Sequence, residues 1–141
     1  MTQRNAVIAA GIVLLLGVVA GFLYFPRNTE NAEPLQIDCS DIVQGCGTGA
    51  LNIRADRPPG IMRPFELRVQ TENAEAVHVS FAMQGMEMGL NRYRMLSQGK
   101  GEWIAEVTLP VCARGRIDWL MQVEVRRGQA SNVYVLGFTS E

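Results

Sequence analysis

The sequence predicts an all-β fold, an immunoglobulin-like antiparallel β-sandwich of about seven or eight strands, preceded by one N-terminal transmembrane helix. Three observations predict it. Residues 6–25 form a run of twenty without a charge. The rest of the chain contains short segments in which apolar and polar residues alternate with a period of two. Turn-forming residues separate these segments, and no helical period of 3.6 residues competes with the strand pattern.

The uncharged run is long enough to cross a bilayer, because as a helix it would rise about 30 Å. Arg4 and the terminal amine precede it, whereas Glu30 and Glu33 lie beyond Arg27. This charge distribution favours a cytoplasmic N-terminus. An alternative is a signal peptide cleaved after Val18-Val-Ala20. We expect four parts: a cytoplasmic N-terminus (1–5), a membrane helix (6–25), a linker (26–34) and a β-sandwich domain (35–141) outside the membrane.

Each expected strand is marked by its alternating apolar residues. The segments are 35–39, Leu51 with Ile53, Phe65 to Val69, Val77 to Met83, 92–96, Trp103 to Leu109, Ile117 to Val125, and Val133 with Val135. Turns rich in Gly, Pro and Asn lie between them, such as Arg57-Pro-Pro-Gly60 and Arg127-Gly128. Their number and spacing are typical of an immunoglobulin-like sandwich, although strand order does not follow from spacing.

Composition excludes several classes of function. Lys and Arg total 13 against 14 Asp and Glu, for a net charge of −1, and no basic stripe is present, so a nucleic-acid partner is not expected. His78 is the single histidine. It lies in a predicted strand, without a nucleophile and an orienting group at suitable spacing, so the chain is not expected to be an enzyme. We expect His78 to be an ordinary surface residue.

The three cysteines predict one disulfide. Cys39 and Cys46 bracket a short polar loop and form the natural pair in an oxidising compartment. Cys112 then remains as a third cysteine. It is a buried apolar side chain, a metal ligand or one half of an intermolecular bridge.

Methionines cluster in one segment, where Met83, Met86 and Met88 fall within six positions and Gly85 lies among them. Thioether sulfurs are soft ligands that select Cu(I), so Met86 and Met88 are candidate ligands, with Met83 or Cys112 completing the site. Packing is the competing interpretation. Met83 continues the apolar face of its strand and belongs in the core by period two, while Met86 and Met88 could pack or contact a partner.

Two segments resemble a known group of proteins. Gly85-Met-Glu-Met-Gly-Leu-Asn-Arg-Tyr-Arg94 and Thr108-Leu-Pro-Val-Cys-Ala-Arg-Gly-Arg-Ile-Asp-Trp119, together with the N-terminal span, resemble the FixH-like and YtkA-like bacterial membrane-anchored proteins and a proteobacterial family with a Met-x-Met-Gly motif. The resemblance implies an immunoglobulin-like domain outside the inner membrane that serves in copper handling or haem–copper oxidase assembly. Carried over by position, it covers Met86 and Met88 as one motif and Cys112, Arg116, Asp118 and Trp119 as the other.

Two functions follow as hypotheses. The first is a membrane-anchored periplasmic accessory protein that handles Cu(I), with a membrane oxidase or a copper-delivery protein as partner. The second is a metal-free module that docks on a membrane protein complex through an adaptable methionine turn. Near both motifs lie Arg92, Arg94, Arg114 and Arg116, which we expect to form a structural ion-pair cluster with Asp118.

Overall fold

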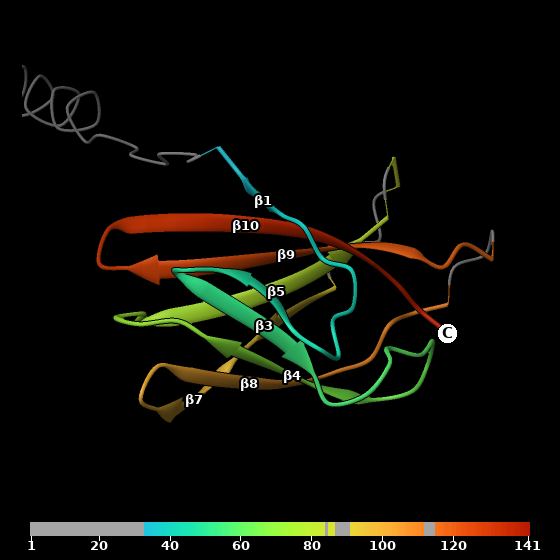
Figure 1. The fold of residues 1–141 in the computed structure, drawn as a ribbon, viewed down its shortest axis with the longest axis horizontal. Coiled ribbons are helices and arrows are strands. Elements are labelled where there is room, and N and C mark those ends of the chain that lie inside the picture. The colour runs from blue at the N-terminus through green and yellow to red at the C-terminus, as the bar shows by residue number, and fades with distance from the viewer. Residues whose placement is uncertain (1–32, 84, 87–90, 112–114) are drawn as a thin grey trace, which may run out of the picture. The chain divides into compact units, whose positions relative to one another are not determined.

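The fold is known from a computed structural model that describes residues 33–83, 85–86, 91–111 and 115–141 (Figure 1). Asn31–Glu141 forms one compact unit. In the described part of this unit the chain forms strands and no helix, so the predicted all-β class is confirmed. No helix within these ranges is long and apolar enough to cross a membrane. The predicted membrane helix (6–25), Met88 and Cys112 lie outside the described residues.

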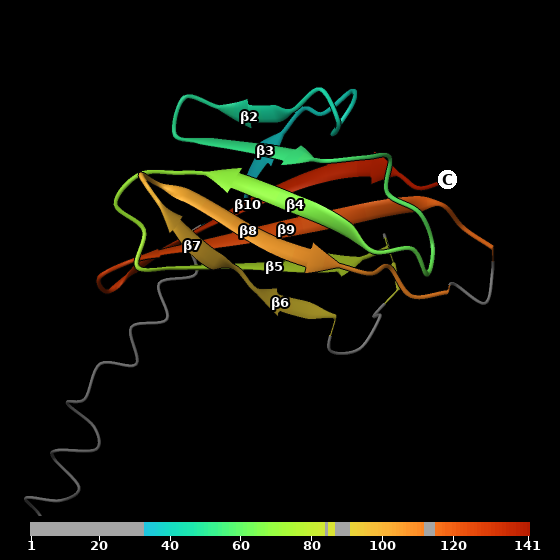
Figure 2. The same ribbon diagram turned by 90° about the horizontal axis from the view of Figure 1, so that it is seen from below.

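Ten strands within the described ranges form two five-stranded sheets that lie face to face (Figures 1 and 2). The first sheet contains, in spatial order, β1 (Leu35–Ile37), β10 (Ala130–Thr139), β9 (Asp118–Arg127), β5 (Ala76–Ala82) and β6 (Arg92–Arg94). The second contains β2 (Cys46–Thr48), β3 (Leu51–Ala55), β4 (Phe65–Gln70), β8 (Glu102–Val107) and β7 (Leu96–Gly99). Strand β1 runs parallel to β10, and every other pairing among these strands is antiparallel.

The core lies between the two sheets because alternate side chains of each long strand point inward. Phe65, Leu67 and Val69 are buried on β4, and β9 buries every second residue from Trp119 to Val125. Met95 and Met121, which the sequence assigns to packing, are buried as well. The period-two pattern therefore places most of the core correctly.

Both sides of the sandwich are closed by a chain that crosses from one sheet to the other. On one side β6 of the first sheet continues through the buried Met95 into β7 of the second (Figure 2). On the other side the chain passes from β1 to β2, and the Cys39–Cys46 disulfide lies within this crossing. The predicted disulfide is confirmed.

The structure differs from the sequence prediction in strand number and in one strand's orientation. Strand β2 was not predicted because only Cys46 of its three residues is buried, so it carries no apolar alternation. On β10, the buried residues are Tyr134 and Leu136 rather than the predicted Val133 and Val135. Apolar residues occupy both odd and even positions of this strand, and the pairing of Tyr134 with the buried Val123 decides which set faces inward.

Candidate functional site

The methionine segment begins with a tight turn directly after β5. The backbone N–H of Met86 donates to the C=O of Met83 at 3.0 Å, and Gly85 accommodates the turn with a φ of 73°. Met83 is 2% exposed and belongs to the core, as its period predicts, whereas Met86 is half-buried and packs against that core. The described part of the site thus joins Met83 and Met86 through a backbone hydrogen bond.

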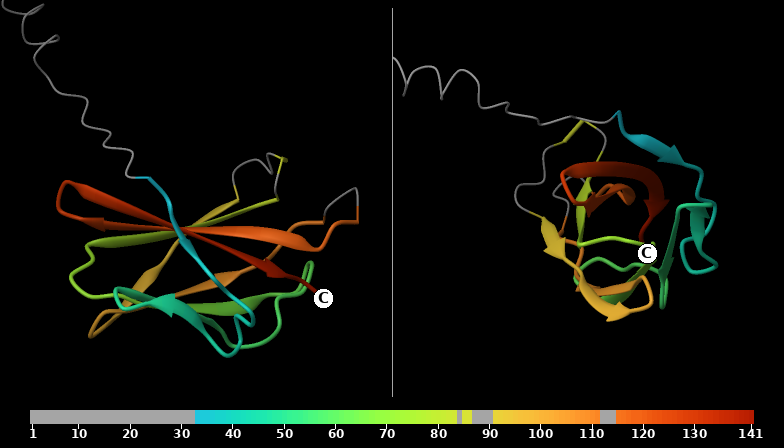
Figure 3. Two further views of the ribbon diagram at one scale, coloured as in Figure 1. Left: turned by 45° about the horizontal axis from the view of Figure 1, so that its top comes forward. Right: turned by 90° about the vertical axis from the view of Figure 1, so that its left-hand side faces the viewer.

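The connection between β5 and β6 and the connection between β8 and β9 both begin and finish at the same end of the sandwich. Ala82, at the end of β5, pairs with Leu120, near the start of β9. The Tyr93 hydroxyl donates to the C=O of Thr108, at the end of β8, at 2.8 Å. The connections between β5 and β6 and between β8 and β9 therefore start and finish side by side (Figure 3). Met88 belongs to the first connection by sequence and Cys112 to the second.

Three apolar side chains that the sequence does not assign to a site are exposed at this end. Met62 is 64% exposed, Val111 65% and Ile117 49%. The backbone N–H of Met62 donates to Leu109 C=O at 2.9 Å, which brings Met62 close to the segment that carries Val111. Ile117 joins them through the C-terminal residues, since Ser140 N–H donates to Ile117 C=O and Glu141 N–H donates to Pro59 C=O. We call Met62, Val111 and Ile117 the apolar end.

Met62 also holds an unusual backbone conformation. Its φ is 56°, in the left-handed region where glycine or asparagine is ordinarily found. Such a conformation costs of order 1 kcal/mol and persists because the surrounding hydrogen bonds hold it. Its place after Pro59-Gly60 in a predicted turn was the only sequence signal for this residue. The structure therefore places an exposed methionine, outside the turn, at the same end of the sandwich as Met86.

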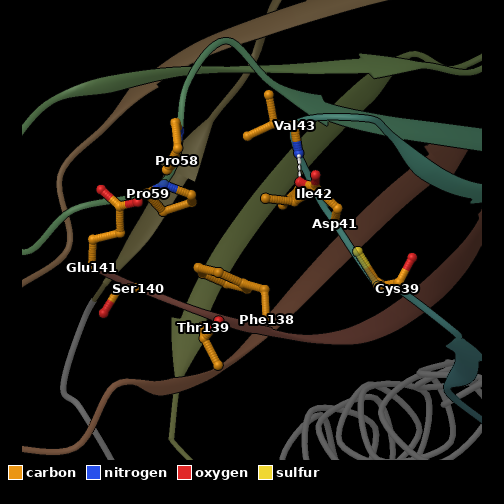
Figure 4. A pocket seen from close by; sticks show the side chains of 11 residues that line it. Cys39, Asp41, Ile42, Val43, Pro58, Pro59, Phe138, Thr139, Ser140 and Glu141 are labelled. Atoms are coloured by element: carbon orange, nitrogen blue, oxygen red, sulfur yellow. Dashed lines mark hydrogen bonds between the residues drawn. The ribbon is translucent and has the colours of Figure 1, made fainter.

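Near the disulfide lies a pocket of about 430 Å³ (Figure 4). Figure 4 shows that it is lined by the segment after Cys39, by Pro58 and Pro59, and by the C-terminal residues from Phe138. The charged side chains that line it are the carboxylates of Asp41 and Glu141, which disfavour an anionic ligand. Asp41 Oδ1 already accepts the N–H of Val43 at 2.8 Å, so this carboxylate serves the loop.

Histidine, cysteine and carboxylate side chains do not form a metal site in the described ranges. No group of three or more His, Cys, Asp and Glu residues that could hold a metal ion occurs within residues 33–83, 85–86, 91–111 and 115–141. Cys39 and Cys46 are consumed by their disulfide. Among the predicted metal ligands, Met83 and Met86 can be placed, and Met88 and Cys112 lie outside the described residues.

His78 lies half-buried on the outer face of the first sheet, where it is paired across the strands with Arg94 and Glu124. Burial lowers the pKa of His78, and the charges of Arg92, Arg94 and Arg126 act in the same direction, while Glu124 opposes them. Folding therefore favours the neutral form of His78.

Two members of the expected arginine cluster pair with different carboxylates, and Arg94 forms no ion pair with a described acidic side chain. Arg92 pairs with Glu124 at 2.5 Å, and Glu124 also accepts the Ser131 hydroxyl at 3.1 Å. Arg116 pairs with Asp118 and lowers the pKa of that carboxyl. Arg114 lies outside the described residues. Glu124 was missed because it lies 32 residues from Arg92 in the chain.

Fold and site together define a two-sheet β domain with a disulfide in one crossing and a methionine turn at one end. Comparison with known proteins adds little to this class. No protein-family model matches the chain, and no curated protein matches it. An engineered protein of known crystal structure is similar at 14% identity and a TM-score of 0.47, over 63% of this chain and 20% of the engineered one. This chain spans only that fifth of the engineered protein, and a likeness at this level carries no argument.

Proposed function

We propose that the chain is a periplasmic accessory protein, held in a bacterial inner membrane by residues 6–25, that handles Cu(I) during assembly of a haem–copper oxidase. Its two-sheet domain would be immunoglobulin-like. The observation that carries the proposal is the turn from Met83 to Met86, closed by a 3.0 Å hydrogen bond, with the half-buried Met86 at the end from which both motifs leave.

The chemistry of the proposed site follows from its sulfur atoms. Thioethers are neutral and soft, so they bind Cu(I) without a deprotonation step and can release it to a partner. Met86 and Met88 are the principal ligands, and Cys112 completes the set. Met83 is nearly inaccessible to solvent, so its thioether would join only from the core side of the turn.

A competition titration tests the proposal. The full chain in a mild detergent is titrated with Cu(I) against a chelator, beside a variant that carries Met86→Leu and Met88→Leu. Leucine keeps the bulk of methionine and removes the sulfur. We expect about one Cu(I) per wild-type chain and loss of this binding in the double variant.

Met62→Leu is the matched control, because Met62 is an exposed methionine outside the turn. It should bind Cu(I) as the wild type does. Undiminished binding by the double variant, or failure of the wild type to compete with the chelator, would contradict the proposal.

The apolar end supports a second candidate, a metal-free docking module. Met62, Val111 and Ile117 each expose apolar surface on segments that backbone hydrogen bonds link at one end of the sandwich, and such surface commonly marks a contact with another protein. The partner would be the membrane oxidase complex. A variant with Met62→Ser and Val111→Ser should lose association with the purified oxidase while keeping its Cu(I) binding. Association that survives in this variant would exclude the apolar end as the docking surface.

A further inference from the structure

The outer edge of β6 is open in the described part of the chain. β6 is the last strand of the first sheet, and no described strand pairs with its far side (Figure 2). Asn91 C=O accepts from Phe81 N–H at 3.1 Å, and Met95 N–H donates to Val77 C=O at 2.9 Å. Backbone groups alternate in direction along a strand, so those of Arg92 and Arg94 point away from β5. This edge therefore offers two N–H donors and two C=O acceptors.

The edge strand carries two arginines. Arg92 and Arg94 are exposed and lie on β6 directly opposite Ser80 and His78 of β5. Arg126 lies farther in, on β9 opposite Ala76, and it is the third arginine that acts on His78. Glu124 is the carboxylate that acts on His78, and it is already paired with Arg92. Within the described ranges, neither Arg94 nor Arg126 forms an ion pair with an acidic side chain.

We propose that the outer edge of β6 binds an extended acidic segment of a partner protein by strand addition. Its main chain would pair with the backbone groups of Arg92 and Arg94, and its outward carboxylates would face the guanidinium groups. The inference is independent of Cu(I) binding, because none of these residues belongs to the methionine turn.

A polypeptide fits this edge better than a lipid or a free phosphate does. The edge presents donors and acceptors in alternation along a strand, whereas a phosphodiester only accepts hydrogen bonds, and a compact free phosphate cannot pair with both N–H and both C=O groups at once. An added strand supplies both kinds of group. Its side chains alternate between the two faces, so the inward ones would lie beside the half-buried Tyr93. The expected partner sequence therefore alternates acidic and apolar residues.

The arginines also make the edge selective. Charged side chains on an edge strand oppose indiscriminate pairing, and β6 of a second copy would bring arginines against arginines. An acidic strand is attracted by the same charges that reject neutral or basic ones. Arg92 and Arg94 would thus exclude self-association while admitting the partner.

The test uses the full chain in a mild detergent and a synthetic peptide that alternates glutamate and valine. Binding is measured by titration, and amide exchange is followed residue by residue by NMR. We expect the amides of Arg92 and Arg94 to become protected when the peptide binds. Arg94→Glu should weaken binding about fivefold or more, because it replaces an attractive cross-strand pair with a repulsive one.

Two further variants separate the local charge from the net charge. Glu124→Gln releases Arg92 from its ion pair and should strengthen peptide binding. Lys100→Glu makes the same charge change as Arg94→Glu in the turn between β7 and β8 of the second sheet, and it should leave the affinity unchanged.

Three outcomes would overturn the proposal. The first is equally strong binding by a peptide with the same charges and N-methylated backbone amides, since strand addition needs those N–H groups. The second is a loss of binding in Lys100→Glu as large as the loss in Arg94→Glu. Finally, protection of Arg92 and Arg94 by phosphatidylglycerol in mixed micelles, with none from the peptide, would assign the edge to lipid.

Discussion

Tyr93 and Thr108 join the two sheets through a reciprocal pair of hydrogen bonds. The Tyr93 hydroxyl donates to Thr108 C=O at 2.8 Å and accepts from Thr108 N–H at 3.3 Å. Tyr93 lies on β6 of the first sheet, and Thr108 directly follows β8 of the second. The Tyr93 side chain therefore satisfies both backbone groups of Thr108, at the end of the sandwich where the β5–β6 and β8–β9 connections begin and finish.

Removal of the Tyr93 hydroxyl should destabilise the domain. Tyr93→Phe leaves the N–H and C=O of Thr108 without their partner, and we expect a loss of about 1–3 kcal/mol in the free energy of unfolding. Urea denaturation followed by tryptophan fluorescence measures it. Tyr134→Phe is the matched control, because Tyr134 is buried and its hydroxyl makes no hydrogen bond with the described residues. Equal effects in the two variants would show that the reciprocal pair contributes nothing.

The disulfide should stabilise the domain by constraining the unfolded chain. Cys39 and Cys46 close a loop with a sequence separation of seven, for which chain entropy predicts about 2.5 kcal/mol. A variant with Cys39→Ser and Cys46→Ser should unfold at correspondingly lower urea. A reducing agent should shift the wild type by a similar amount and leave the double variant unchanged. An equal shift in both proteins would mean that the reductant acts at another site.

Labelling identifies the remaining thiol. If Cys39 and Cys46 are paired in every molecule, the unfolded but oxidised chain should accept about one thiol label, on Cys112. Label found on Cys39 would contradict the pairing in solution.

The alternation of apolar and polar residues predicted the fold best where one face of a strand is buried and the other is exposed to solvent. On β4 the inward Phe65, Leu67 and Val69 are separated by polar residues, so the sequence admits one orientation. On β10 apolar residues occupy both parities, and the orientation depends on pairing with β9. The predicted strand 92–96 divides at Met95 because the chain changes sheets there, which no local pattern reveals.

The site is harder to predict from the sequence than the fold, because it depends on contacts between segments that are far apart in the chain. Met83 could be assigned to the core because it continues an apolar face. The exposure of Met62 could not be predicted, since the hydrogen bond from its N–H to Leu109 C=O fixes the conformation of its loop. Likewise, the open edge of β6 becomes visible only once the strand order is known.

Gly101 should be far less tolerant of substitution than Gly99. Both have a positive φ, of 77° and 88°, so a side chain strains the backbone at either position. A Cβ at Gly101 would lie 2.7 Å from Thr71 C=O, whereas a Cβ at Gly99 would meet no atom within 4 Å. The backbone contact cannot yield as a flexible side chain would. Gly101→Ala should therefore lower the free energy of unfolding by about 1 kcal/mol or more beyond Gly99→Ala, as urea denaturation would measure.

His78 should make the stability of the domain depend on pH. Folding lowers its pKa below the usual 6.5, chiefly through burial and then through Arg92, Arg94 and Arg126. The unfolded chain therefore binds a proton at higher pH than the folded chain does. The contribution of His78 is fully present above about pH 7 and is lost as the pH falls through 6.5 toward the folded pKa.

Unfolding free energies measured from about pH 8 to about pH 5.5 test this, because His78 of the unfolded chain titrates there while carboxyl groups with ordinary pKa values remain charged. We expect the wild type to lose stability over this window and His78→Gln to lose less, since glutamine does not titrate. The difference should shrink when Arg94→Gln is added to both proteins, because Arg94 is one of the charges that lower the pKa of His78. A wild type whose stability rises on acidification over this window would show that folding raises the pKa of His78, and the assigned effect of burial and the three arginines would then be wrong.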